Sequence, residues 1–126
     1  MLQKIQSIFT NQQETREHHD DPQLRSRYYK VTKKTAIATL QEVFKQLQGF
    51  EVGHVSEERG EMSVNVKLRK KAFMVVSVVT VRPFETAIDF TVSTETPLPI
   101  DFGFSKQVIA SLYQQLDQKL PKVDRN

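Results

Sequence analysis

The chain has 126 residues, of which 38% are hydrophobic and 26% charged, and its 18 Lys and Arg against 15 Asp and Glu give a formal net charge of +3. This length favours one domain, which can bury roughly two thirds of its unfolded surface. The absence of Cys excludes disulfide scaffolds, cysteine nucleophiles and thiolate metal sites, and no apolar run approaches the roughly 20 residues of a transmembrane segment.

The first ten residues form a segment of their own. Apolar residues recur there at helical spacing, at Leu2, Ile5, Ile8 and Phe9. Residues 1–10 are therefore predicted to form a short amphipathic helix. So short a helix is unstable alone, so it either packs on its own domain or docks on a partner.

A polar stretch separates this segment from the rest of the chain. Residues 11–22 are almost wholly polar without periodicity, which is typical of a linker. Pro22 marks its end. A single domain is expected over residues 23–121, followed by a frayed polar tail at 122–126.

A strand and a helix come first in the domain. Residues 25–31 alternate, with Tyr29 and Val31 on one side, which is typical of a short strand. Thr32 is a suitable helix N-cap, and Gly49 stands where a helix normally stops. Between them the apolar residues follow a helical stripe: Ala36, Ile37, Leu40, Val43, Phe44 and Leu47.

Four strands follow, because the short turns between them leave no room for helices. They are expected at residues 50–56, 61–69, 72–82 and 86–94. The second shows the clearest alternation of apolar and polar residues. Since short turns join them, successive strands are predicted to be antiparallel.

The strand at 72–82 is apolar on both faces, which is typical of a strand covered on both sides. One face carries Phe73, Val75, Val79 and Val81. The other face carries Met74, Val76 and Val78. One layer of helices covers only one side of a sheet, so these last three residues are the expected anchors of a second subunit, unless the N-terminal helix covers them.

The segment 96–103 contains two prolines and a glycine, so it predicts a structured loop. Leu98, Ile100, Phe102 and Phe104 make it too apolar for a plain solvent loop. These residues either cap the core or form an exposed docking patch. Phe102 and Phe104 are therefore further interface candidates.

A second helix closes the domain. Ser105 is a suitable N-cap, and the apolar stripe that follows is Val108, Ile109, Leu112, Tyr113, Leu116 and Leu120. The element order is thus β-α-β-β-β-β-α. Two amphipathic helices need an apolar surface, so the sequence predicts a two-layer α+β fold, with a five-stranded antiparallel sheet and both helices on one face.

Two runs of sequence carry a resemblance to known proteins. Residues 25–29 read RSRYY and residues 100–105 read IDFGFS. Over residues 25–120 the chain resembles small uncharacterised bacterial cytosolic proteins of β-α-β4-α layout, which implies a cytoplasmic location and no particular activity. More distantly, the layout resembles helix-grip domains, in which a curved sheet cradles a long C-terminal helix. That resemblance implies an apolar ligand pocket.

Motifs that carry chemistry are sparse. His18, His19, Asp20 and Asp21 are adjacent and lack the i, i+3 or i, i+4 spacing of helical metal sites, so they predict a solvated segment. His54 has no acidic partner visible in the sequence and predicts a packed or edge histidine. No nucleophile elbow and no phosphate-binding glycine motif occurs. We therefore expect no catalytic residue, no metal and no cofactor.

Association with another protein, as a homodimer through the sheet, is the leading expectation for this non-enzymatic domain. A first alternative is a small apolar ligand between the last helix and the sheet, bound by Phe90, Leu112 and Tyr113. A second alternative is nucleic acid, bound at basic strand ends by Arg25, Arg27, Tyr28, Lys67 and Arg69. Charged strand ends also protect sheets from edge-to-edge aggregation, so they disfavour the nucleic-acid interpretation.

Overall fold

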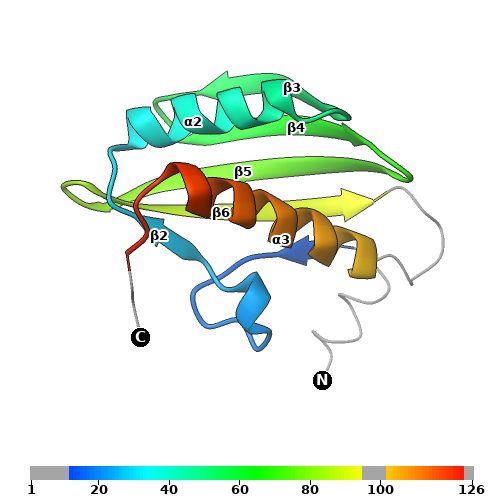
Figure 1. Ribbon diagram of the computed structural model, residues 1–126, viewed down its shortest axis with the longest axis horizontal. Coiled ribbons are helices and arrows are strands. Elements are labelled where there is room, and N and C mark those ends of the chain that lie inside the picture. The colour runs from blue at the N-terminus through cyan, green and yellow to red at the C-terminus, as the bar shows by residue number, and fades with distance from the viewer. Residues whose placement is uncertain (1–11, 95–101, 124–126) are drawn as a thin grey trace.

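The computed structural model describes residues 12–94 and 102–123 (Figure 1). Its elements are β1 (Gln12–Glu14), the 3-10 helix η1 (Pro22–Leu24), β2 (Arg27–Tyr29), α2 (Lys33–Gln46), β3 (Phe50–Ser56), β4 (Glu61–Lys67), β5 (Lys71–Arg82), β6 (Glu85–Thr94) and α3 (Phe102–Lys119). The predicted helix at 1–10 and most of the predicted loop at 96–103 lie outside the described residues. α3 begins at Phe102, before the predicted cap at Ser105.

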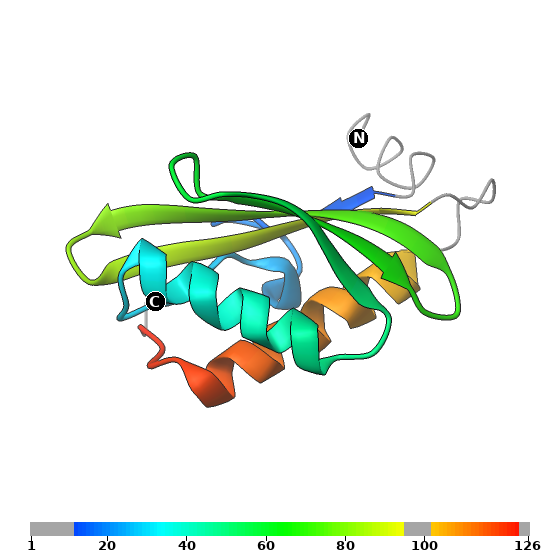
Figure 2. The same ribbon diagram turned by 90° about the horizontal axis from the view of Figure 1, so that it is seen from above.

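The strands form one antiparallel sheet in the order β1-β6-β5-β4-β3, with β2 also paired to β6. β1 and β2 share one edge of β6, because Gln12 pairs with Ser93 and Arg27 pairs with Ile88. Six strands therefore make a sheet five positions wide. Both helices lie on the same face of this sheet (Figure 2). The predicted two-layer α+β fold is confirmed.

The two helices build the layer that covers the sheet. The Thr32 hydroxyl caps α2 by accepting a hydrogen bond from the Thr35 backbone N–H at 3.2 Å. The chain turns after α2 at Gly49, whose φ of +92° favours glycine. The helices fill the core with Ala36, Ile37, Leu40, Val43, Phe44, Phe104, Val108, Ile109, Leu112, Tyr113 and Leu116. No helix in the described ranges is long and apolar enough to cross a membrane.

The helices cover the face of β5 that carries Met74, Val76 and Val78, so these residues are core residues. Their side chains are at most 2% exposed. The expectation that they point away from the helices is wrong. Instead, Phe73 (46% exposed), Val79 (53%) and Val81 (41%) lie on the uncovered face.

Strand register explains this choice of face. Met74 pairs with Val64 on β4 and with Val92 on β6, so its face is apolar across three strands. Phe73 pairs with Asn65 and Ser93, so its face is polar on both neighbouring strands at this level. The helices bury the wider apolar surface because burial stabilises in proportion to apolar area.

Residues 11–22 were expected to be a linker, but the described part of them belongs to the domain. β1 extends the sheet, and the Thr15 backbone N–H donates to the Phe90 carbonyl at 2.8 Å. Residues 16–25 then leave the sheet as a loop and return at Ser26, whose N–H donates to the Arg16 carbonyl at 3.0 Å. Composition hides this arrangement, since an edge strand with few apolar side chains resembles a linker in sequence.

Candidate functional site

We call the sheet face opposite the helices the outer face (Figure 2). Its apolar part, the β5 stripe, consists of Phe73, Val75, Val79 and Val81, and its three members Phe73, Val79 and Val81 are among the large apolar side chains that are exposed. Ala87 on β6 pairs with both Val79 and Tyr28, so the stripe widens toward β2 at this level. No other apolar stripe of this length lies open on the described strands.

Small polar side chains flank the stripe. Half-buried Ser63 and Thr91 pair with Val75 from the two neighbouring strands, and Asp89 pairs with Ser77. Because these flanking side chains are small, the apolar side chains of the β5 stripe project slightly above them, and a flat partner can approach the stripe. Such a surface suits another sheet, since packed sheets approach to about 10 Å.

Charged residues lie at both ends of the outer face. Lys67 and Lys71 pair directly across β4 and β5 at one end. At the other end, Arg82 forms an ion pair with Glu85 at 3.6 Å. The outer face therefore has apolar side chains along β5, interrupted by Ser77 opposite Asp89, and charged residues at its ends. Apolar residues with a polar border are the usual anatomy of a protein interface.

Phe104, an interface candidate in the sequence, caps the core instead. It is buried on α3, and the Arg69 guanidinium carbon lies 5.4 Å from the centre of its ring. This outcome corresponds to the core-capping alternative for the apolar loop. The side chain of Phe102 lies outside the described residues.

Phe90, Leu112 and Tyr113 fill the core and do not line a cleft. Phe90 and Tyr113 pack edge to face with ring centres 5.0 Å apart, and all three side chains are at most 1% exposed. The Tyr113 hydroxyl donates to the Ile88 carbonyl at 2.6 Å. Burial raises the pKa of the Tyr113 hydroxyl. This tight packing removes the ligand site that was expected between the last helix and the sheet.

The nucleic-acid candidates are scattered over the fold. Arg27 points toward α3, where it donates to Asp117. Arg25 donates from Nε to the His19 carbonyl at 2.9 Å. Tyr28 and Lys67 belong to the outer face on strands separated by β6 and β5, as the register shows.

Arg69, the fifth nucleic-acid candidate, contacts α3 through Gln107 at 3.2 Å. α3 covers the opposite side of the sheet from Tyr28 and Lys67 (Figure 2). No continuous basic and aromatic platform therefore joins the five residues.

The histidine-rich segment forms an ordered loop. The Asp21 backbone N–H donates to His19 Nδ1 at 3.0 Å, and Lys106 on α3 contacts the Asp21 carboxylate at 2.7 Å. Burial and the nearby Arg16 charge lower the pKa of His19. Within the described residues, no group of three His, Asp or Glu side chains is placed to hold a metal.

His54 is exposed at a bulge in the edge strand β3. Its backbone N–H donates to the Ser63 hydroxyl at 2.9 Å. The edge position agrees with one of the two alternatives that the sequence left for this residue.

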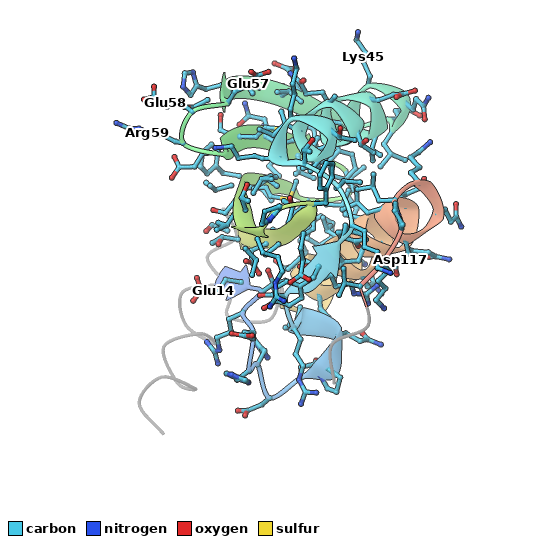
Figure 3. The ribbon with its side chains drawn as sticks, turned by 90° about the vertical axis from the view of Figure 1, so that its left-hand side faces the viewer. Glu14, Lys45, Glu57, Glu58, Arg59 and Asp117 are labelled. Atoms are coloured by element: carbon cyan, nitrogen blue, oxygen red, sulfur yellow. The ribbon has the colours of Figure 1, made fainter. Side chains whose placement is uncertain are left out.

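Sequence reasoning missed a polar cluster beneath α3. Asp117 accepts hydrogen bonds from Arg27 and from the Tyr29 hydroxyl, which lies 2.7 Å away (Figure 3). Burial, with this hydrogen bond, raises the pKa of Tyr29. The Arg27 guanidinium also lies 4.6 Å from the centre of the Tyr113 ring. The only sequence signal was an acidic residue on a helix whose stripe faces the sheet.

Two surface grooves lie elsewhere. One, of about 430 Å³, lies between α2 and β3. The other, which we call the α3 groove, has a volume of about 300 Å³ and is lined by Leu47, Gln48, Phe50, Leu68, Arg69, Phe104, Gln107, Val108 and Ser111. Neither groove reaches Phe90, Leu112 or Tyr113.

The chain matches no protein-family model and no curated protein sequence.

Proposed function

We propose that the protein is a non-enzymatic, cytoplasmic association module that forms a homodimer through the outer face of its sheet. The observation that carries this proposal is the exposure of Phe73, Val79 and Val81 along one side of β5. These exposed apolar side chains follow one strand, with a single interruption at Ser77, and contiguous exposed apolar surface marks interaction sites.

The size of the outer face supports a dimer. Five strand positions spaced about 4.8 Å apart, and a stripe about 27 Å long, give a face of roughly 650 Å². A standard interface uses about 800 Å² on each partner. The face is therefore large enough when its border contributes.

The chemistry of the outer face supports a second copy as the partner. An isologous dimer brings the same patch of both subunits together, so one surface must complement itself. A ridge of Phe and Val flanked by Ser and Thr does so, because no large side chain projects from its centre and no cluster of like charge occupies it.

The hydrogen bonds of two partly buried carboxylates, Asp117 and Asp89, support a non-enzymatic role. Asp117 is engaged by Arg27 and Tyr29, and Asp89 accepts hydrogen bonds from Thr15 and Ser26. Asp117 thus fastens α3 to β2, and Asp89 fastens the segments around Thr15 and Ser26 to β6.

Sedimentation velocity of the full chain from about 1 to 100 µM tests the proposal. The wild type should be dimeric at the upper concentrations. Phe73→Asp and Val79→Asp should each be monomeric, because they place a negative charge within the β5 stripe. Leu68→Asp is the matched control, since Leu68 is 45% exposed but lines the α3 groove, away from the outer face. A monomeric wild type would refute the proposal, as would equal dissociation by Leu68→Asp.

The alternative to a second copy is that residues 1–10 of the same chain cover the outer face. If residues 1–10 cover the β5 stripe within one chain, the wild type is monomeric and Ile5→Ser/Ile8→Ser induces self-association. If a second copy covers it, the double substitution leaves the dimer intact. The two arrangements thus give opposite results in the same measurement.

A further inference from the structure

The α3 groove lies at the end of the molecule where three parts of the chain meet. The end of α2 supplies Leu47, the β4–β5 turn supplies Leu68 and Arg69, and the first turns of α3 supply Phe104 and Val108. In Figure 1 this region lies at the right-hand end of the sheet, near the beginning of α3. The groove is on the helix side, apart from the outer face.

Leu68 gives the groove an apolar wall. This side chain is 45% exposed although it lies beside buried Phe104 and Val108. Leu68 packs closely on the Gly49 backbone, because a Cβ on Gly49 would lie 2.5 Å from Leu68 Cδ2. The rest of the Leu68 side chain leaves apolar surface open in the groove.

Arg69 gives the same groove a cationic rim. One guanidinium nitrogen donates to Gln107 Oε1 at 3.2 Å, and the guanidinium carbon lies 5.4 Å from the Phe104 ring centre. A guanidinium has five N–H donors, so this hydrogen bond leaves most of them for a ligand. The contacts to Gln107 and Phe104 orient the guanidinium in advance, which lowers the entropic cost of binding.

The turn that carries Arg69 is strongly basic. Lys67, Lys70 and Lys71 accompany Arg69 within five consecutive positions, and Leu68 is the only other residue there. Lys67 and Lys71 belong to the outer face, but the summed charge of the turn makes this end of the molecule electropositive, which attracts anions. Charge and lining together favour a ligand with an anionic head and an apolar body.

We propose that the α3 groove binds a free monocarboxylate with an unbranched apolar chain. The carboxylate pairs with the Arg69 guanidinium, whose planar fork matches its two oxygens. The chain lies against Leu68, Phe104 and Val108. The groove, of about 300 Å³, has room for an alkyl chain along this apolar lining. This small-ligand site is independent of the proposed homodimer.

Decanoate is the probe, titrated into the full-length ¹⁵N-labelled protein and followed by NMR. The amide signals of Leu68, Arg69 and Gln107 should shift together, with a dissociation constant of about 1 mM or below. Butyrate has the same carboxylate as decanoate but a short chain. Decyltrimethylammonium has a ten-carbon chain but a cationic group in place of the carboxylate. Both should bind at least tenfold more weakly than decanoate.

Two variants separate the groove from general surface charge. Arg69→Gln should weaken decanoate binding about tenfold or more, because a hydrogen-bonded charge pair is lost. Lys70→Gln is the matched control, since it removes the neighbouring charge from the same turn but does not line the groove. It should change the affinity less than threefold.

Three results would overturn the proposal. Equal weakening by both variants would show attraction to charge alone. Shifts centred on Phe73 and Val79 would place the ligand on the outer face. The absence of any shift at 10 mM decanoate would show that the groove is closed to ligands in solution.

Discussion

Arg27 on β2 donates a hydrogen bond to Asp117 on α3, 90 positions later in the chain. The two side chains are 23% and 29% exposed, so solvent screens their ion pair only in part. Tyr29 donates to the same carboxylate. β2 is three residues long, so this contact with α3 adds to its pairing with β6 in holding it at the sheet edge.

Asp117→Ala should destabilise the protein by about 2–4 kcal/mol, since it leaves Arg27 and the Tyr29 hydroxyl without their acceptor. Asp117→Asn should cost less, because one oxygen acceptor remains. Urea unfolding measures both. Gln118→Ala on the exposed side of α3 is the control, with an expected change within about 0.5 kcal/mol. A loss for Asp117→Ala as small as that of the control would contradict a structural role.

Alkaline pH should destabilise the fold through Tyr29 and Tyr113. Burial raises the pKa of both hydroxyls above their usual value of 10.0, so the folded state keeps protons that the unfolded chain releases. The stabilisation is complete below about pH 10 and declines as the pH rises further. Each tyrosine should contribute a slope of up to about 1.4 kcal/mol per pH unit.

Urea unfolding between pH 9 and 11.5 measures this slope. Tyr29→Phe and Tyr113→Phe should each make it shallower, because each removes one titrating group while lysine titration is unchanged. An identical slope in the wild type and both variants would show that these tyrosines ionise equally in the folded and unfolded chain.

Gly60 should not tolerate a side chain. Its φ is +69°, and a Cβ would lie 2.1 Å from the Val78 carbonyl oxygen. Gly60→Ala should therefore destabilise the protein by about 2 kcal/mol or more, from backbone strain and the close contact together. Thermal or urea unfolding provides the measurement.

Gly103 is the matched control for that substitution. It lies in the first turn of α3, and a Cβ there meets no described atom within 4 Å. Gly103→Ala should leave the free energy of unfolding unchanged or raise it by up to about 1 kcal/mol. Equal losses at both glycines would mean that side-chain size, and not φ and the Val78 contact, determines the cost.

Met74 and Phe73 should respond differently to truncation. Met74→Ala should cost about 2–5 kcal/mol, because it leaves a cavity in the core. Phe73→Ala should cost less than about 1 kcal/mol in a monomer, since the side chain is 46% exposed. Urea unfolding below the dimer dissociation constant keeps association out of the comparison. The reverse order of costs would place the helices on the other face.

The fold was predictable because its signals are local. The stripes of α2 and α3 have helical spacing, and the alternation of β4, with Met62, Val64 and Val66 buried, follows a period of two. Short turns then require antiparallel pairing. These features depend only on neighbouring residues, so one sequence suffices to read them.

The covered face of β5 was not predictable in the same way. Phe73 and Met74 are both apolar, so alternation within β5 cannot distinguish the two sides. The distinction comes from Val64, Val92, Asn65 and Ser93, which reach β5 only once the register is known. The interface candidates therefore changed from Met74, Val76 and Val78 to the β5 stripe, while the proposed kind of association stayed the same.

Hydrogen bonds between residues far apart in the sequence were also not predictable. Asp89 accepts hydrogen bonds from Thr15 at 2.8 Å and from Ser26. Thr15 precedes the loop at 16–25 and Ser26 follows it. The Asp89 carboxylate therefore holds both ends of the loop to β6. Nothing in the local pattern of a polar segment shows that a distant strand supplies its acceptor.

Asp89→Ala should release this loop while leaving the domain folded. Arg16 and Arg25 are exposed and lie within it, so trypsin should cleave there about tenfold faster once the two hydrogen bonds are lost. Mass spectrometry of a digestion time course identifies the sites. Arg59, exposed at the β3–β4 turn, provides an internal reference that should not change (Figure 3). Equal acceleration at Arg59 would instead show global unfolding, and unchanged cleavage at Arg16 and Arg25 would show that the loop is held without Asp89, by its backbone hydrogen bonds and the contact of Lys106 with Asp21.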